Sequence, residues 1–153
     1  MTDLVRPRPL PGAVLFACNF NRVRSPMAEA LLRRALGDRI YVDSCGLRVD
    51  ADPEARAVDP FVEAVMAELS CDLSDHRAKS FDQLEDDSFD LIVSLTPEAQ
   101  HRAVELTRGR SAEIEYWPTL DPTLVDGSRE ARLIAYREVR DALAAKIAQR
   151  FAP

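Results

Sequence analysis

Residues 14–37 read VLFACNFNRVRSPMAEALLRRALG, and this stretch predicts a strand, a loop and a helix in succession. The apolar run Val14 to Ala17 is typical of a short buried strand. Pro26 to Leu36 is typical of a helix, because Ser25 can cap it and proline suits the first helical position. The loop between them would therefore lie at the carboxyl end of a strand and at the start of a helix.

The rest of the chain repeats this alternation. Apolar runs predict strands at residues 40–43, 90–95 and 114–117, and helices are expected to begin at Asp59-Pro60, at Thr96-Pro97 and at about Ser128. Strands that are joined by helices form parallel sheets with both faces covered. We therefore expect one α/β domain over residues 13–153, with a four-stranded parallel sheet flanked by helices on both faces, after an N-terminal arm at 1–12.

Composition excludes several classes of protein. The 153 residues are 46% hydrophobic and 30% charged, which is ordinary for one globular domain. The net charge of −6 argues against general nucleic-acid binding, and the longest apolar run is too short to span a membrane. Prolines 7, 9 and 11 interrupt the place of a signal peptide, so a cytoplasmic protein is expected. Three cysteines without a CxxC pair and two histidines suggest no disulfide framework, no metal and no cofactor.

The loop after the first strand combines a nucleophile with an anion-binding arrangement. Cys18 stands at the end of the strand, and Arg24 follows six residues later, just before the helix. Backbone N–H groups and a helix N-terminus attract anions, an arginine can grip a tetrahedral oxyanion, and the same field favours a thiolate. The Cys–Arg spacing alone decides nothing, and a plain strand–turn–helix with a buried cysteine is the alternative. The surrounding strand, Ser25, Pro26 and helix favour an anion site.

The motif Cys18-x-x-Asn21-x-x-Arg24-Ser25-Pro26-Met27-Ala28-Glu29 resembles the signature of low-molecular-weight protein tyrosine phosphatases and of the related thioredoxin-coupled arsenate reductases. The resemblance extends over nearly the whole chain from Ala13, and includes residues 42–46, 72–77 and 89–93. It implies a small four-stranded parallel sheet with flavodoxin-like winding.

The resemblance also implies roles for individual residues. Cys18 would attack phosphorus and form a phosphocysteine intermediate, and Asp121 would act as general acid and then as general base. Asp52 and Asp59 also precede prolines, but only Asp121 follows the fourth expected strand, and Asp59 is interpreted as a helix cap. The phosphoryl oxygens would be held by Arg24 and the loop amides, that is by Asn19, Phe20, Asn21, Arg22, Val23, Arg24 and Ser25.

Four residues match the family's supporting positions. They are Asn21, Ser25, Ser44 and His76. Asn21 tolerates the positive φ that such a loop needs, and Ser25 would support the thiolate. A solvent-facing loop histidine is the alternative interpretation of His76.

Other loop positions depart from the family pattern. Phe20 replaces a frequent glycine, and Val23 replaces the second cysteine common in phosphatases, so that Cys45 is the remaining candidate for a disulfide with Cys18, or else a buried thiol. Arg22 occupies the position that sets substrate choice and suggests a more acidic substrate, unless it points to solvent. Thr123 and Leu124 stand where many relatives carry tyrosines, so the aromatic wall would have to come from Phe20, Tyr116 or Trp117.

Three functions remain as hypotheses. The first is a cysteine-dependent phosphomonoester hydrolase, similar to a protein tyrosine phosphatase, acting on a phosphorylated protein or a small phosphomonoester, with inorganic phosphate as a further ligand. The second is an arsenate reductase, which the absence of a cysteine pair from Ser94 to Ala99 disfavours. The third is a catalytically weak protein that binds a phosphorylated ligand. Neither a nucleic acid nor a membrane is an expected partner.

Overall fold

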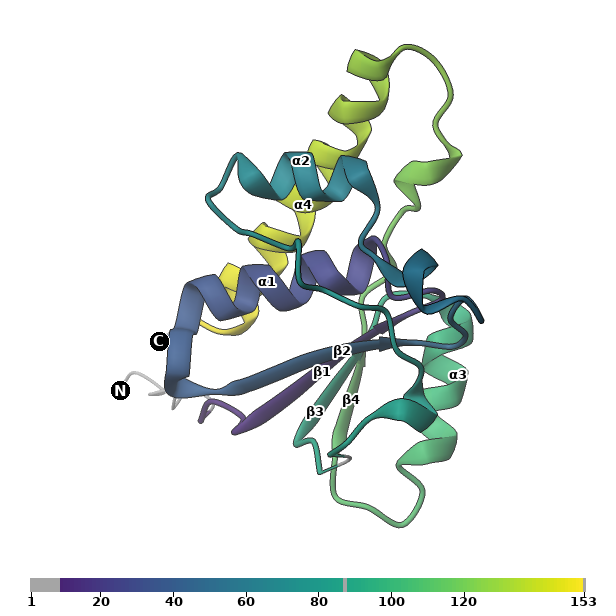
Figure 1. Cartoon of the computed structure of the whole chain (residues 1–153). Coiled ribbons are helices and arrows are strands. Elements are labelled where there is room, and N and C mark those ends of the chain that lie inside the picture. Colours follow the sequence, from purple (N-terminus) through teal and green to yellow (C-terminus); the bar gives the residue numbers. More distant parts are fainter. Residues whose placement is uncertain (1–8, 87, 153) are drawn as a thin grey trace, which may run out of the picture.

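The computed structural model describes residues 9–86 and 88–152. Within these residues the centre of the molecule is a parallel sheet of four strands, β1 (Ala13–Cys18), β2 (Tyr41–Gly46), β3 (Leu91–Ser94) and β4 (Glu113–Tyr116). The strand order is β2-β1-β3-β4, which places β1 and β3 in the middle (Figure 1). The predicted four-stranded α/β fold is therefore confirmed.

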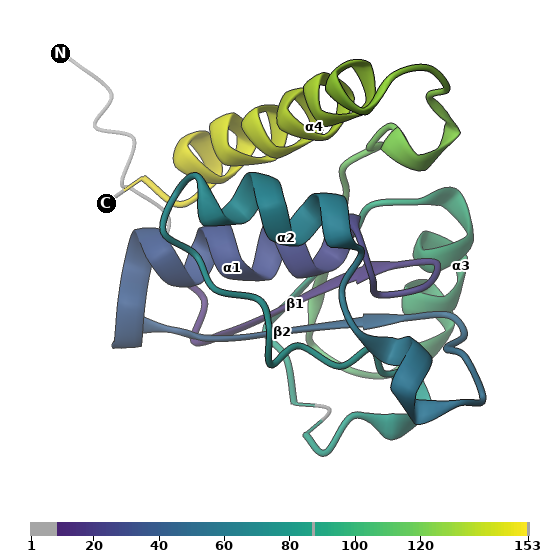
Figure 2. The same ribbon diagram turned by 45° about the horizontal axis from the view of Figure 1, so that its top comes forward.

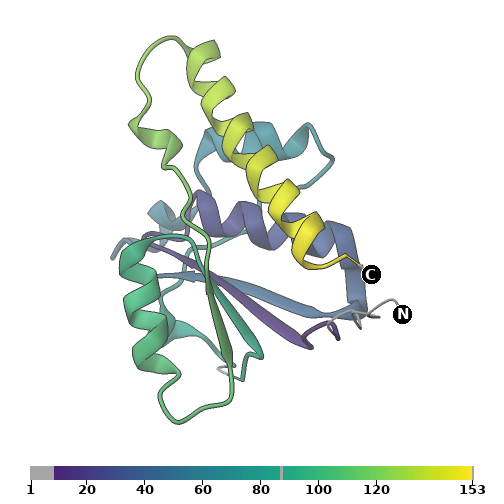
Figure 3. The ribbon, with the colours of Figure 1, turned by 180° about the vertical axis from the view of Figure 1, so that it is seen from behind.

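The helices form a layer on each face of this sheet. Helices α1 (Arg24–Leu36), α2 (Pro60–Ala67) and α4 (Arg129–Arg150) lie on one face, with α4 packed across α1 and α2 (Figure 2). Helix α3 (Pro97–Leu106) covers the opposite face, as the view from behind shows (Figure 3). Both faces of the sheet are thus buried, as expected for parallel strands.

Strand β1 supplies side chains to both cores. Val14, Phe16 and Cys18 belong to the core beneath α1, α2 and α4, whereas Leu15 and Ala17 belong to the core beneath α3. This follows from the alternation of side chains along a strand. It means that the Cys18 side chain lies on the side of the sheet that α1 covers.

Three of the expected helix starts are confirmed by capping hydrogen bonds. Asp59 Oδ1 accepts from the backbone N–H of Phe61 at 2.8 Å, where α2 begins. Thr96 Oγ1 accepts from Ala99 N at 3.1 Å at the start of α3, and Ser128 caps α4 in the same way. These side chains satisfy N–H groups that have no partner inside the helix.

The predicted cap of the first helix is wrong. Helix α1 begins at Arg24, its N-cap position is Val23, and no side chain caps it. Ser25 lies inside the first turn and is fully buried, with its hydroxyl turned toward Cys18 instead of toward the helix backbone. The Ser25 hydroxyl does not cap because it is engaged by Cys18 Sγ, Asn21 Nδ2 and Cys45 O.

The segments that follow the strands meet at the carboxyl edge of the sheet. Leu47 N, just after β2, donates to the carbonyl oxygens of Cys18 and Asn19 at 3.1 and 2.9 Å. Thr119 N, after β4, donates to Leu95 O at 3.2 Å. This edge is where ligands bind in open parallel sheets.

The predicted N-terminal arm is described only from residue 9 onward. Tyr41 N donates to Gly12 O, which joins the approach to β1 to the start of β2. The first eight residues of the predicted N-terminal arm lie outside the described residues. None of the helices within 9–86 and 88–152 has the length and apolar character needed to cross a membrane.

Candidate active site

A cavity of about 410 Å³ opens at the carboxyl edge of the sheet. The loop after β1 forms one wall, the segment after β2 forms a second, and the segment after β4 closes the third side. Cys18, Arg24 and Asp121 all line it. The structure therefore brings together the three residues that the sequence analysis assigned to catalysis, although they are up to 103 positions apart (121 − 18).

Cys18 is almost completely buried at the bottom of this cavity. Only 2% of the surface of Cys18 is exposed, and its Sγ lies 2.9 Å from Ser25 Oγ. Asn21 Nδ2 donates to the same hydroxyl at 2.8 Å, so the oxygen already accepts one hydrogen bond. Ser25 Oγ also lies 3.3 Å from Cys45 O, to which it can donate, so the sulfur of Cys18 and this carbonyl oxygen are the two groups that the Ser25 proton can reach.

Arg24 joins the first turn of α1 to the segment after β4. Its Nη1 donates to Thr119 O at 2.9 Å, and its Nη2 lies 3.9 Å from Asp121 Oδ2. The residue is only 9% exposed, so the guanidinium is held mainly by protein. It can supply two parallel N–H groups to an oxyanion above Cys18.

Asp121 has its carboxylate positioned by its own turn. Thr123 N and Thr123 Oγ1 donate to Asp121 Oδ1 at 3.0 and 2.6 Å, where a short 3₁₀ turn begins at Pro122. The second oxygen, Oδ2, is the one that faces Arg24. Asp52 makes the same kind of turn with Glu54 N, but it does not line the cavity.

Asp59 caps α2, as expected, and also lines the cavity, which the sequence did not indicate. Its Oδ2 accepts from the Tyr136 hydroxyl at 3.0 Å. Burial and the nearby Asp59 carboxylate raise the pKa of Tyr136, so the hydroxyl remains a donor. Both oxygens of Asp59 are thus occupied by protein donors.

Asn21 holds the loop in its unusual conformation. The residue is fully buried and has a φ of 56°, in the left-handed region. Its Nδ2 donates to Ser25 Oγ at 2.8 Å and to Ser44 Oγ at 2.9 Å, and its Oδ1 accepts from Lys79 N at 3.0 Å. The side chain therefore links the loop to two distant segments while the backbone turns the loop inward.

Ser44 and His76 stand behind Asn21, where the sequence analysis placed its partners. Ser44 Oγ donates onward to Glu29 Oε1 at 2.6 Å. His76 Nε2 lies 2.8 Å from the carbonyl oxygen of Asn21, and burial lowers the pKa of His76 below its ordinary value. The alternative of a solvent-facing loop histidine is therefore wrong.

Several supporting contacts were not foreseen from the sequence. A Cβ atom on Gly46 would lie 2.8 Å from Asn21 N and 2.9 Å from Phe20 C, so the loop backbone rests directly on this glycine. Thr96 Oγ1 donates to Asn19 Oδ1 at 2.7 Å. A glycine directly after a buried cysteine was the only sequence signal for the first contact, and the second had none.

Arg22 is fixed at the cavity wall. Its Nε donates to Ala57 O at 2.8 Å, and its carbonyl oxygen accepts from Asp59 N at 3.0 Å. The alternative of an arginine that points freely to solvent is therefore wrong. These two hydrogen bonds attach the loop after β1 to the segment that precedes α2.

The expected aromatic wall is only partly present. Phe20 lines the cavity and is 56% exposed. Trp117 is instead buried in the core, with ring centroids 5.9 Å from Phe16 and 6.4 Å from Phe151, and neither Trp117 nor Tyr116 lines the cavity. The prediction that Trp117 or Tyr116 supplies the aromatic wall is therefore wrong. The side chain of Trp117 packs in the core instead.

Cys45 lies on the opposite side of the sheet from Cys18. It pairs with Ala17 in the strand register and belongs to the core beneath α3, whereas Cys18 belongs to the core beneath α1. Burial and the nearby Cys18 and Asp43 raise the pKa of Cys45 well above its usual value. The two sulfurs point to different faces, so a Cys18–Cys45 disulfide is excluded by geometry.

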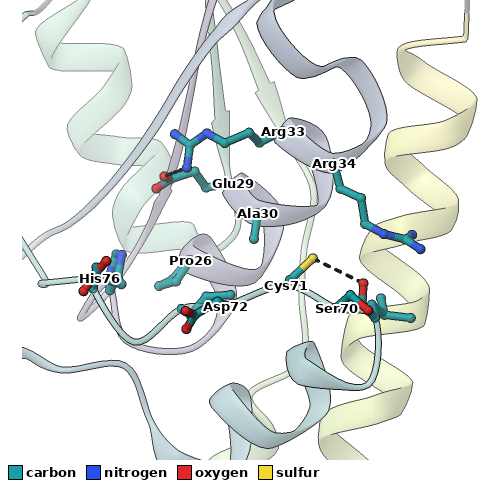
Figure 4. A pocket seen from close by; sticks show the side chains of 12 residues that line it. Pro26, Glu29, Ala30, Arg33, Arg34, Ser70, Cys71, Asp72 and His76 are labelled. Atoms are coloured by element: carbon teal, nitrogen blue, oxygen red, sulfur yellow. Dashed lines mark hydrogen bonds and ion pairs between the residues drawn. The ribbon is translucent and has the colours of Figure 1, made fainter.

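A larger cavity, of about 660 Å³, lies elsewhere, between the outer side of α1 and residues 69–76 (Figure 4). Glu29, Arg33, Cys71 and His76 are among the residues that line it, and Arg33 Nη1 pairs with Glu29 Oε2 at 2.9 Å. It contains neither Cys18 nor Arg24. It shares Glu29 and His76 with the network behind the loop, but the chemistry that the loop supports belongs to the smaller cavity.

The described residues, 9–86 and 88–152, contain no cluster of three or more histidine, cysteine or acidic side chains that could hold a metal ion. The side chains that line the active-site cavity include one thiol, three guanidinium groups and three carboxylates.

Comparison with known proteins identifies the family. Residues 13–152 match the family model described as low molecular weight phosphotyrosine protein phosphatase. An arsenate reductase of Halalkalibacterium halodurans is 30% identical over 134 residues, which are 88% of this chain and 91% of the relative. A low molecular weight protein-tyrosine-phosphatase of Streptomyces coelicolor is 34% identical over 123 residues, 74% of this chain and 72% of the relative.

A solved structure of an arsenate reductase in its phosphate-binding state superposes with a TM-score of 0.71 at 26% identity, covering 90% of this chain and 94% of the other. The match to the family model includes all four strands, the loop after β1 and the segment after β4. The chain belongs to the low molecular weight phosphotyrosine protein phosphatase family.

Proposed function

We propose that the protein is a cysteine-dependent phosphomonoester hydrolase of the protein-tyrosine-phosphatase type. The observation that carries this proposal is that Cys18, Arg24 and Asp121 line one cavity. A thiol, an oxyanion-binding guanidinium and a carboxylic acid are the groups that two-step phosphoryl transfer requires.

In the first step, Cys18 Sγ attacks phosphorus while the bond to the leaving oxygen breaks. The Ser25 hydroxyl, 2.9 Å from the sulfur, stabilises the thiolate before attack. Arg24 and the inward amides of residues 19–25 hold the phosphoryl oxygens, and protonated Asp121 gives its proton to the leaving oxygen. The product of this step is a phosphocysteine and a free alcohol or phenol.

In the second step, a water molecule attacks the phosphocysteine. Asp121, now a carboxylate, takes a proton from this water, the sulfur–phosphorus bond breaks, and inorganic phosphate leaves. Cys18 returns to the thiolate that Ser25 stabilises.

Arsenate reduction is the second candidate, because four relatives that are each 29 to 30% identical to this chain are named arsenate reductases. Reduction needs further thiols to release the arsenic from Cys18. Cys45 faces the other side of the sheet. The segment from Ser94 to Ala99, where a cysteine pair would be expected, contains no cysteine, and its Thr96 caps α3 and donates to Asn19. These contacts favour hydrolysis over reduction through a thiol pair of this chain's own.

The experiment is turnover of p-nitrophenyl phosphate and of phenyl phosphate by the wild type, Cys18→Ser and Asp121→Asn, with vanadate as inhibitor. Cys18→Ser is expected to abolish hydrolysis. Asp121→Asn is expected to slow phenyl phosphate about 10²-fold or more, and p-nitrophenyl phosphate less, because p-nitrophenolate leaves without a proton. Asp52→Asn removes a carboxylate from the same kind of turn outside the cavity and is expected to keep wild-type rates.

The other candidates give different results. Arsenate-dependent oxidation of thioredoxin or glutaredoxin, without ester hydrolysis, would assign the protein as a reductase. Tight vanadate binding with neither reaction would assign it as a protein that only binds phosphorylated ligands.

A further inference from the structure

The active-site cavity contains more guanidinium groups than phosphate binding at Cys18 requires. Arg22 and Arg48 line it together with Arg24. Arg24 is directed at Thr119 O and at Asp121, the residue proposed as the acid. The side chains of the other two arginines have no role in the two steps described above.

Arg22 is positioned but not saturated. Its Nε is bound to Ala57 O at 2.8 Å, which fixes the guanidinium at the wall. Within residues 9–86 and 88–152, its two terminal nitrogens have no protein acceptor. A half-buried guanidinium that is anchored at one nitrogen presents its remaining N–H groups in a fixed direction.

Arg48 approaches from the segment after β2. Its backbone N–H donates to Asn19 O at 3.2 Å, so its Cα is attached to the beginning of the phosphate-binding loop. Its side chain is exposed and forms no hydrogen bond or ion pair with the described part of the chain. Arg48 thus lines the cavity with side-chain donors that no group of the described residues occupies.

Three carboxylates line the same cavity, and two of them have both oxygens engaged by other groups. Asp59 is occupied by Phe61 N and the Tyr136 hydroxyl, and Asp121 by Thr123 and Arg24. Asp50 accepts from Asp52 N through Oδ1. None of the three forms an ion pair with Arg22 or Arg48 among the residues that the structure describes.

We propose that Arg22 and Arg48 form a second anion subsite, which selects phosphomonoesters that carry another negatively charged group beside the phosphate. This inference rests on the proposed function and names its substrate class. Planar guanidinium groups bind carboxylates and phosphates through paired, charge-assisted hydrogen bonds. Phe20 is the only aromatic side chain among the described residues that line the cavity, so recognition depends more on charge than on enclosure of a phenyl ring.

The test measures peptide binding to Cys18→Ser, which binds without turnover. Three phosphotyrosine peptides of equal length serve as probes, with alanine, aspartate or phosphoserine on both sides of the phosphotyrosine. We expect the aspartate and phosphoserine peptides to bind about tenfold more tightly than the alanine peptide. The chain's net charge of −6 gives no general attraction for acidic peptides, so this preference would have to arise locally.

Substitution of the subsite should then remove the preference. In the Cys18→Ser protein, Arg48→Gln is expected to reduce the ratio of the affinities for the acidic and alanine peptides from about tenfold to about threefold. Arg22→Gln together with Arg48→Gln is expected to reduce this ratio to about one. Arg108→Gln is the matched control, because Arg108 is exposed just beyond the far end of α3 and does not line the cavity, and it should keep the full ratio. A ratio that falls with added salt would agree with an exposed charge-based subsite.

Each outcome bears on the subsite separately from the hydrolase. Equal affinities for the three peptides, binding of none of them, or a preference that survives in the double variant would overturn the subsite. A preference for only one of the two acidic peptides would keep it and identify a carboxylate or a second phosphate as the ligand. Preferential binding combined with no hydrolysis of any peptide by the wild type would keep the subsite and refute the proposed hydrolase.

Discussion

His76 Nε2 lies 2.8 Å from the backbone carbonyl oxygen of Asn21, the residue at which the loop after β1 turns through a positive φ. A carbonyl oxygen only accepts, so Nε2 carries a proton in this contact. The imidazole is mostly withdrawn from water, and burial lowers the pKa of His76 despite the favourable carbonyl contact. The neutral ring is thus the form that supports the loop.

The first prediction concerns the pH dependence of folding. The folded-state pKa of His76 is below its unfolded value, so the unfolded chain takes up a proton that the folded chain resists. The contribution of His76 to the free energy of unfolding is complete above about pH 6.5 and decreases as the pH falls below it. The free energy of unfolding, measured with urea, should therefore change less between pH 7.5 and pH 5.5 in His76→Gln than in the wild type.

The chain's other histidine is the control for this measurement. His101 is exposed and pairs with Glu105 on α3. His101→Gln should keep the wild-type difference between the two pH values. An unchanged difference in His76→Gln would contradict the assignment of the effect to His76.

The second prediction concerns Asn21. Asn21→Ala removes donors to Ser25 and Ser44 and the acceptor for Lys79 N, and it places an ordinary residue at a φ of 56°. We expect a loss of about 3 kcal/mol in the free energy of unfolding, and weaker binding of vanadate. Asn21→Gly loses the same side chain but accepts the backbone conformation, and should be about 1 kcal/mol more stable than Asn21→Ala. Equal stability of the two variants would show that the backbone conformation carries no cost.

The third prediction concerns the contact between strand β2 and the loop. In Gly46→Ala the new Cβ would meet Asn21 N at 2.8 Å and Asn19 O at 3.0 Å, and both are backbone atoms that cannot rotate away. The loop must therefore move, and we expect kcat/KM for p-nitrophenyl phosphate to fall at least tenfold, on the order of what a displacement near 1 Å costs. Overpacking should also lower the free energy of unfolding by about 1–3 kcal/mol.

A second glycine separates the movement of the loop from general destabilisation. Gly109 has a φ of +78° and no heavy atom within 4 Å of an added Cβ. Gly109→Ala should cost about 1 kcal/mol in stability and leave kcat/KM unchanged. Wild-type kcat/KM in Gly46→Ala would show that the loop does not depend on this contact.

The fourth prediction concerns oxidation. Cys18 and Cys45 point to opposite faces of the sheet, and burial raises the pKa of Cys45, so peroxide should oxidise Cys18 without forming a disulfide between them. Peptide mass spectrometry under non-reducing conditions should find no Cys18–Cys45 peptide. Cys45→Ser should regain the same fraction of activity as the wild type after peroxide and then dithiothreitol, and a cross-linked peptide in the wild type would contradict the structure.

The fold could be predicted from local signals because they agree with one another. Apolar runs marked the strands, and Asp59, Thr96 and Ser128 marked helix starts through the same side chains that cap them in the structure. Ser25 belongs to the same class of residue but does not cap. Its environment is set by the sulfur of Cys18, which a local propensity does not include.

The site could be predicted less completely, because its supports are distant in sequence. The contact of Arg22 with Ala57 joins residues 35 positions apart, and that of Asn21 with Lys79 joins residues 58 apart. Both use backbone groups, which every residue possesses, so no residue type marks them in the sequence. Trp117 shows the opposite error, since an aromatic residue near the site is used by the core instead.

The dispersal of the loop's supports has a consequence for how activity is acquired during folding. Residues 18–25 form a contiguous segment, but their conformation is held by Ser44, Ala57, His76 and Lys79, which come from segments that follow α1, β2 and α2. A folding intermediate that contains only β1 and α1 would have the nucleophile and the arginine without the shape that makes them reactive. Recovered turnover after refolding would therefore report the final assembly of the tertiary structure, and should appear later than the helical circular dichroism signal.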